Sequence, residues 1–329
     1  MRRRDFIALL GGVTAWQTAR AQPPLQPRRL AVVAVATALG DMNETADNPA
    51  WRALFKELRR LGYIEGQNLI VERFSAEGHI ERFADLAREV VSRNPDVVVV
   101  AYGPLVKALQ STTATIPIVG MMADPVVQGI VSNVAKPGGN VTGVSVVASP
   151  EIWPKRLQIL LEIIPSASRV AFLSSQSEGP AQILQQVAGQ LGITLLWSRL
   201  EGPIQSRYRR AFEEMITDRA DGLIVYDDGE NFANRRLIVE LAEQARLPAI
   251  YPYREFFEIG GLVAYGTNLA EGWRRIVGYV DQIFNGTKPG ELPIYLESKF
   301  ELLVNAKAAK AFGVTIPTSL ILRADEVIE

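Results

Sequence analysis

Short runs of β-branched residues alternate along the chain with segments in which apolar residues recur every three to four positions. The runs predict strands and the spaced positions predict amphipathic helices, an order typical of a parallel α/β sheet covered by helices. The first buried strand is predicted at 30–37. The helix after it presents one apolar face, made by Trp51, Leu54, Phe55, Leu58 and Leu61.

The same alternation continues through two sets of elements. In the first set it predicts further strands at 68–74, 96–102, 117–122 and 141–147, with helices near 80–91 and 104–111. After Pro150 it predicts helices at 154–164, 183–191, 207–217 and 235–245, with strands at 169–174, 193–197, 222–226 and 249–253.

The two sets run in the same order, which predicts two similarly built lobes. The alternative is that the similarity reflects only the common pattern of βαβ units. The first set contains Leu61-Gly62, then the strand that begins at Asp96, then Ile116-Pro117. The second set contains the corresponding segments in the same order, namely Leu191-Gly192, the strand after Asp221, and Leu247-Pro248. Later elements at 261–267, 271–284, 292–296, 300–304 and 305–312 indicate a chain that recrosses between the lobes.

The first 21 residues have the pattern of an export signal. Three arginines precede an apolar stretch at 6–16 that is too short to span a bilayer, and Ala19-x-Ala21 supplies the small residues of a cleavage site. Arg3-Arg4-Asp5-Phe6-Ile7 resembles the twin-arginine export motif, while a general secretory signal or a buried first helix are the alternatives. We expect cleavage near Ala21, a flexible leader at 22–29 and a mature protein in the periplasm.

Composition excludes several classes of site. The chain of 329 residues has no cysteine, so disulfides, Cys-ligated zinc, iron–sulfur clusters and cysteine nucleophiles are all excluded. Its formal net charge is −1, and removal of residues 1–21, with four arginines and one aspartate, makes it −4. This mild acidity argues against nucleic acid as a partner, because phosphate binding requires clustered lysine and arginine.

No recognisable catalytic set is present. His79 is the single histidine, and its position before a helix is typical of an exposed loop or cap residue. The sequence has no Gly-x-Ser-x-Gly elbow, no phosphate-binding loop, and no Gly-x-Gly-x-x-Gly fingerprint after the first strand. We therefore predict a protein that is not an enzyme and that needs no cofactor and no metal.

A ligand is expected beyond the carboxyl ends of the strands, where open α/β sheets bind their ligands. Gly103 with Pro104 suits a helix start whose N–H groups hold a carboxylate, and Ser174 with Ser175 would do the same from the other lobe, with ordinary strand-to-helix turns as the alternative. Carboxylates would pair with a ligand amine, and tyrosines would form aromatic walls. The predicted ligand-binding residues are Asn43, Tyr102, Gly103, Asp124, Ser174, Ser175, Asp227, Tyr253 and Tyr265.

The whole chain resembles a known family, the periplasmic substrate-binding proteins of ABC transporters whose characterised relatives bind tryptophan and other aromatic amino acids. The resemblance rests on segments at 1–12, 61–69, 135–143, 247–255, 260–266, 299–305 and 323–329. It implies a type I periplasmic-binding fold with two Rossmann-like lobes, a ligand cleft between them and three crossovers, near 147–150, 267–270 and 297–300. One lobe would comprise 30–147 plus about 269–297, and the other 148–268 plus about 298–329.

The resemblance implies the solute-binding component of an import system. A monomer would capture a small molecule, an amino acid or an aromatic or carboxylate solute, and deliver it to the permease in the inner membrane. A ligand-binding sensor module for a membrane receptor has the same fold and remains an alternative. An exported oxidoreductase is a further alternative, which the missing cofactor fingerprint disfavours.

Overall fold

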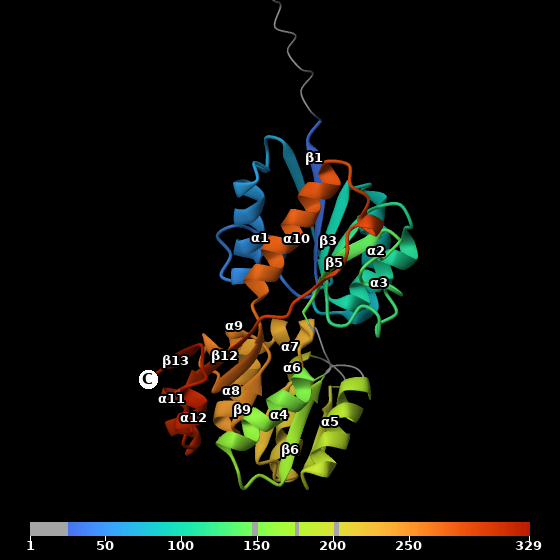
Figure 1. The fold of residues 1–329 in the computed structure, drawn as a ribbon. Helices are drawn as coiled ribbons and strands as arrows, with labels where there is room; N and C mark the ends of the chain where they lie inside the picture. Colours follow the sequence, from blue (N-terminus) through green and yellow to red (C-terminus); the bar gives the residue numbers. More distant parts are fainter. Residues whose placement is uncertain (1–25, 147–150, 175–177, 201–203) are drawn as a thin grey trace, which may run out of the picture.

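The computed structural model describes residues 26–146, 151–174, 178–200 and 204–329, and these form two lobes, each built around its own sheet (Figure 1). The α/β fold with two lobes of mainly parallel strands is therefore confirmed. The predicted signal peptide, the first part of the leader, the crossover near 147–150 and Ser175 lie outside the described residues.

The sheet of lobe 1 has six parallel strands in the order β11-β5-β4-β3-β1-β2. Its central strands are almost entirely apolar because helices cover both faces of a parallel sheet. The strands are β1 (Arg28–Ala34), β2 (Leu69–Ser75), β3 (Val97–Ala101), β4 (Ile118–Met122), β5 (Val141–Ser145) and β11 (Tyr295–Leu296).

Two helix layers cover this sheet, and alternate residues of β1 face each layer. On one face lie α1 (Pro49–Arg60) and α10 (Leu269–Phe284), which pack together through Trp51 and Trp273, with ring centroids 5.1 Å apart. On the other face lie α2 (Phe83–Ser92) and α3 (Gly103–Thr112). Short 3₁₀ turns η1 (Leu39–Asp41), η2 (Ile80–Arg82) and η3 (Pro289–Glu291) complete the lobe.

The sheet of lobe 2 has seven strands in the order β13-β12-β10-β9-β8-β6-β7, and only the β10–β12 pair is antiparallel. The strands are β6 (Arg169–Ser174), β7 (Thr194–Arg199), β8 (Gly222–Val225), β9 (Ala249–Tyr251), β10 (Val263–Thr267), β12 (Phe300–Asn305) and β13 (Glu326–Ile328). The helices are α4 (Ile152–Ile163), α5 (Glu178–Gln190), α6 (Ile204–Thr217), α7 (Gly229–Ala233), α8 (Arg235–Gln244), α9 (Arg254–Phe257), α11 (Ala306–Phe312) and α12 (Thr318–Ile321).

The chain passes from the second sheet to lobe 1 between β10 and α10, and returns between β11 and β12 (Figure 1). The residue limits given above for the two lobes stay a prediction. The sequence pattern did not predict α7, α9, α12 or β13, all of which have only three to five residues. Two of them, α7 and α9, follow strands of lobe 2 directly, at the edge that faces lobe 1.

Candidate ligand site between the lobes

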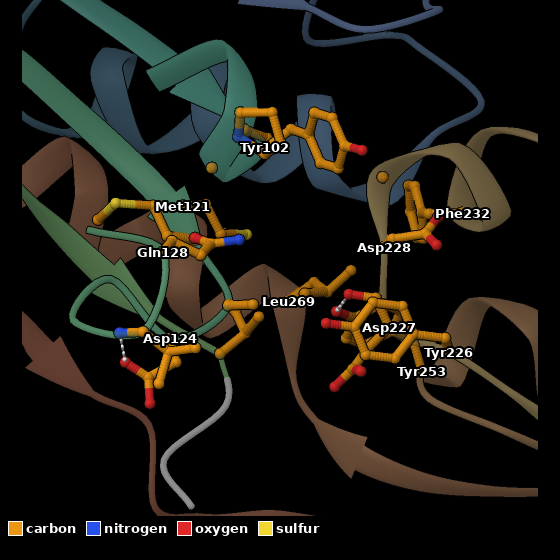
Figure 2. Close-up of a pocket in the computed structure, with 18 of the residues that line it drawn as sticks. Tyr102, Met121, Asp124, Gln128, Tyr226, Asp227, Asp228, Phe232, Tyr253 and Leu269 are labelled. Carbon is orange, nitrogen blue, oxygen red and sulfur yellow. Dashed lines mark hydrogen bonds between the residues drawn. The ribbon is translucent and has the colours of Figure 1, made fainter. Parts of the chain in front are cut away.

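A cavity of about 460 Å³ lies between the lobes, and we call it the apolar chamber (Figure 2). Lobe 1 lines it with the carboxyl ends of β3 and β4, the start of α3 and the start of α10. Lobe 2 lines it with the ends of β8 and β9, α7 and one residue each of α4 and α5. Its side chains are mainly aromatic or aliphatic, among them Tyr102, Met121, Val127, Val146, Trp153, Ile183, Tyr226, Phe232, Tyr253 and Leu269.

Five of the nine residues predicted from the sequence line this chamber, namely Tyr102, Gly103, Asp124, Asp227 and Tyr253. Asn43 lines a second cavity, described below. Ser174 is fully buried and Tyr265 stacks on Phe300, with ring centroids 5.7 Å apart, and neither lines the apolar chamber. The chamber is where the strand-end argument placed a ligand.

Tyr102 and Gly103 form the start of α3 on the lobe 1 side. Tyr102 has φ of +105°, a conformation that costs free energy for an aromatic residue, and its N–H donates to the Met121 carbonyl oxygen at 2.8 Å. The absence of a side chain at Gly103 makes room for the amide of Gln128, which lies where a Cβ would be. Backbone strain held by neighbouring structure is common at binding sites.

Asp227 belongs to a buried ion pair beneath the chamber. Its carboxylate accepts a hydrogen bond from Trp153 Nε1 at 3.0 Å and lies 3.4 Å from the Arg156 guanidinium, and both partners of the pair have side chains only 1% exposed. Arg156 Nε also donates to the Tyr265 carbonyl oxygen at 2.9 Å. The carboxylate that sequence reasoning assigned to a ligand amine is thus engaged by the protein itself.

Asp228 starts α7 and belongs to a second buried network. Its carboxylate accepts from the N–H of Asn231 at 2.6 Å, and the amide of Asn231 accepts from the Tyr208 hydroxyl at 2.8 Å. Burial raises the pKa of Tyr208 well above its usual value. Burial also raises the pKa of Glu230 to about 7, against the opposing effect of its ion-pair partner Arg207. These bonds fix α7 against β8 and so position Phe232.

Asp124 closes the loop after β4 on the opposite side. Its carboxylate accepts from the N–H groups of Val126 and Val127 at 2.9 and 3.0 Å, which is the geometry of an Asx turn. Lys107 lies nearby and donates to the Gln128 carbonyl oxygen at 3.2 Å. The carboxylates of the apolar chamber therefore all have protein partners, and its remaining wall is suited to apolar groups.

The two lobes approach each other closely at Gly229 and Tyr102, on the rim of the chamber. A Cβ on Gly229, at the start of α7, would lie 3.2 Å from the Cδ2 atom of Tyr102. Figure 2 shows Tyr102 facing the α7 segment that carries Asp228 and Phe232. Glycine at this position lets the aromatic ring of lobe 1 rest on the backbone of lobe 2.

A second cavity of about 680 Å³ opens on the α1 side of the cleft, and we call it the polar chamber. Lobe 1 lines it with the end of β1, the loop that follows and the start of α1, including Asn43, Asp41 and Asp47. Lobe 2 lines it with α7 and with Arg235 and Arg236 of α8. Three residues line both chambers, namely Ala101, Gly229 and Phe232.

Sequence reasoning missed several lining or supporting residues. Arg156 follows Trp153 by three positions and precedes Leu160 by four, so the helical spacing places all three on one buried face. A charged residue at such a position was a signal that could have been used. Phe232 and Asn231 lie in the five-residue helix α7, which left no periodic pattern.

Across the described ranges, no group of three or more histidine or acidic side chains is arranged to hold a metal ion. His79 is exposed and precedes η2, with Nδ1 at 3.0 Å from a Glu81 carboxylate oxygen, in keeping with a cap or loop position. The helices of these same ranges include none that is both long and apolar enough to cross a membrane.

Comparisons with known proteins agree with this architecture. A tyrosine-binding protein of Clostridioides difficile (strain R20291) is 23% identical over 268 residues, which cover 80% of this chain and 76% of the relative. The crystal structure of a conserved domain protein from Vibrio cholerae O1 biovar El Tor superposes with a TM-score of 0.81 at 26% identity, covering 92% of this chain and 100% of that one.

The crystal structure of an ABC domain from Streptococcus pneumoniae in complex with L-Trp superposes with a TM-score of 0.78 at 22% identity. The match covers 92% of this chain and 100% of that one, which shows a shared fold. The family model described as ABC transporter substrate binding protein matches residues 44–328. The chain belongs to this family, and the resemblance found in the sequence is confirmed.

Proposed function

We propose that this member of the ABC transporter substrate binding protein family is the periplasmic component of an import system, which captures a small solute between its lobes and delivers it to a membrane permease. The observation that carries the proposal is the apolar chamber, because its walls come from both lobes. A solute that contacts both walls stabilises the closed arrangement by its differential affinity for that state. No bond chemistry is needed, and we propose no enzymatic activity.

The lining of the apolar chamber favours a solute with an aromatic or other apolar group. Aromatic side chains from lobe 1 and lobe 2 stand on opposite walls, including Tyr102 on one side and Tyr226 and Tyr253 on the other (Figure 2). Two of the relatives described above have names that give a ligand, which is tyrosine for one and L-Trp for the other. We therefore propose an aromatic amino acid or a similar aromatic carboxylate, with Tyr102, Gly103, Asp124, Asp227 and Tyr253 among the lining residues.

Export and partners complete the proposal. Residues 1–21 would act as a signal peptide of the twin-arginine or general secretory type, cleaved near Ala21, and the mature protein would work as a periplasmic monomer. Uptake of labelled solute by cells that lack the gene, compared with complemented cells, tests delivery to the permease. Equal uptake by both would instead support the sensor alternative.

Calorimetric titration of residues 22–329 with L-tyrosine, L-tryptophan and L-phenylalanine tests the ligand class. We expect saturable binding of at least one of them, and a loss of affinity of at least about tenfold in Tyr102→Ala, because an aromatic wall of the chamber is removed. Tyr295→Ala is the matched control, since Tyr295 lies outside both chambers under Arg275. Absence of binding, or equal loss in the two variants, would contradict the proposal.

A further inference from the structure

The polar chamber carries charges of opposite sign on its two walls. Lobe 2 contributes Arg235 and Arg236, and lobe 1 contributes Asp41 and Asp47. Among the described residues, no ion pair within 4 Å joins these arginines to these aspartates or to any other carboxylate. The charges therefore face the cavity without neutralising one another through direct contact.

Arg235 is the most confined of these charges. Its guanidinium lies over the ring of Phe232, with the central carbon 4.9 Å from the ring centroid, and Nη1 donates to the Phe232 carbonyl oxygen at 3.1 Å. The side chain is half-buried, and burial lowers its pKa even though Glu255 and Glu258 act in the opposite direction. A half-buried guanidinium that lacks a carboxylate partner has unused donors in a fixed plane, suited to bidentate recognition of a carboxylate.

Phe232 connects this cation to the apolar chamber. The ring meets Tyr253 edge-on, with centroids 5.9 Å apart, and also carries Arg235. The other two residues shared by the chambers, Ala101 and Gly229, have a small side chain or none. The ring of Phe232 therefore separates the apolar chamber from the Arg235 guanidinium.

We propose that the polar chamber is the subsite for the carboxylate of the solute, with Arg235 as the residue that binds it while the apolar part of the solute fills the apolar chamber. This proposal rests on the proposed function and deepens it, because it assigns the carboxylate of the aromatic solute to a subsite and to the residue that binds it. Asp41 and Asp47 face the same space from lobe 1, where they suit the ammonium group of an α-amino acid. Closure would then bring opposite charges from the two lobes around one zwitterionic head group.

The test uses two series of ligands that share a ring and differ in the charged end. One series is L-tyrosine, 3-(4-hydroxyphenyl)propionate and tyramine, and the other is L-tryptophan, 3-(indol-3-yl)propionate and tryptamine. In the wild-type protein, we expect each amine without a carboxylate to bind about 10- to 100-fold more weakly than the corresponding amino acid, the range of a lost hydrogen bond to a charged group. In Arg235→Gln, the ratio of the amine's dissociation constant to that of the corresponding amino acid should fall to about one, because only ligands with a carboxylate lose a binding partner.

Two further variants separate recognition from general damage. Arg235→Lys keeps the charge without the planar fork and should restore part of the ratio. Arg209→Gln removes an equal charge from an exposed residue that lines neither chamber, and should leave the ratio unchanged. Structural damage in Arg235→Gln would weaken acids and amines alike and leave their ratio intact.

An unchanged ratio in Arg235→Gln, with binding still measurable, would overturn the carboxylate subsite alone. The same holds if the wild-type protein binds amines as tightly as amino acids. Failure of all six compounds to bind would overturn the subsite together with the proposed function.

Discussion

Replacement of Asp227 by alanine should destabilise lobe 2 strongly, because it leaves the buried charge of Arg156 without its partner. The Arg156 side chain is 1% exposed, and its guanidinium lies 3.4 Å from the Asp227 carboxylate. Arg156 keeps one hydrogen bond to the Tyr265 carbonyl oxygen, which does not neutralise a charge. Trp153 Nε1 loses its acceptor in the same variant.

The expected loss in unfolding free energy is about 3–5 kcal/mol, the usual cost of breaking a buried pair by removing one partner. For a lobe of this size, that loss corresponds to a fall in Tm of about 10 °C. Asp227→Asn keeps an acceptor for Trp153 and should recover about 1 kcal/mol of the loss, while the charge on Arg156 stays unpaired.

Differential scanning calorimetry and urea unfolding, followed by circular dichroism, measure this effect. The double variant Arg156→Met, Asp227→Ala removes both charges and should be more stable than Asp227→Ala alone, because no isolated charge remains in the core. Asp85→Ala is the control, since its pair with Arg88 is exposed and contributes little. A loss below about 1 kcal/mol in Asp227→Ala, or a double variant no better than the single one, would refute this reasoning.

Two other predictions follow from the structure. In Gly229→Val, the added Cβ would lie 3.2 Å from Tyr102 Cδ2, so this variant should have a lower solute affinity and, in X-ray scattering, a larger radius of gyration of the solute-bound protein. The control is Gly189→Ala in α5, where an added Cβ would meet no atom within 4 Å, and it should leave both quantities unchanged. Equal behaviour of the two variants would contradict the interlobe contact. Burial raises the pKa of Glu255 from 4.5 to about 7. Between pH 4.5 and pH 7 the native state therefore binds more protons at this group than the unfolded state does, and the free energy of unfolding falls as pH rises through this range. Glu255→Gln should therefore gain stability over the wild type from pH 5 to pH 8, by an amount on the order of 3 kcal/mol, and a difference that is constant with pH in urea unfolding would disprove the assignment.

The alternation of apolar patterns predicted the fold because every long element has its own arrangement of apolar residues, a continuous run in a buried strand and a helical period in an amphipathic helix. The strand Val97–Ala101 is buried on both faces and reads as an unbroken apolar run, while α1 shows one apolar face and a glycine after its end. The short elements α7 and α9 have too few residues for a period, and their starts depend on single residues such as Asp228. Tertiary hydrogen bonds, rather than pattern, determine them.

The candidate site was predictable in position and only partly in detail. The strand-end rule places Ser174 and Tyr265 at the same edge as Asp227, but it does not determine which way each side chain points. Ser174 is buried, and Tyr265 lies against β12, the antiparallel neighbour of its strand. Asp227 reaches the chamber, yet its carboxylate is held by Arg156, a residue whose burial the sequence signalled only through helical spacing.

The division of the cleft into two chambers has a consequence for affinity. An aromatic side chain that buries about 150–250 Å² gains about 4–6 kcal/mol in the apolar chamber. Association and ordering cost at least about 4 kcal/mol, so the apolar chamber alone gives weak binding. The carboxylates there already have protein partners. Under the proposal above, the carboxylate and ammonium groups of the solute would add the remaining favourable contribution at Arg235 and the facing aspartates of the polar chamber. If the proposed binding of an aromatic solute is micromolar, at about −8 kcal/mol, we expect contacts of its charged groups in the polar chamber, beyond the ring of Phe232, to supply the difference.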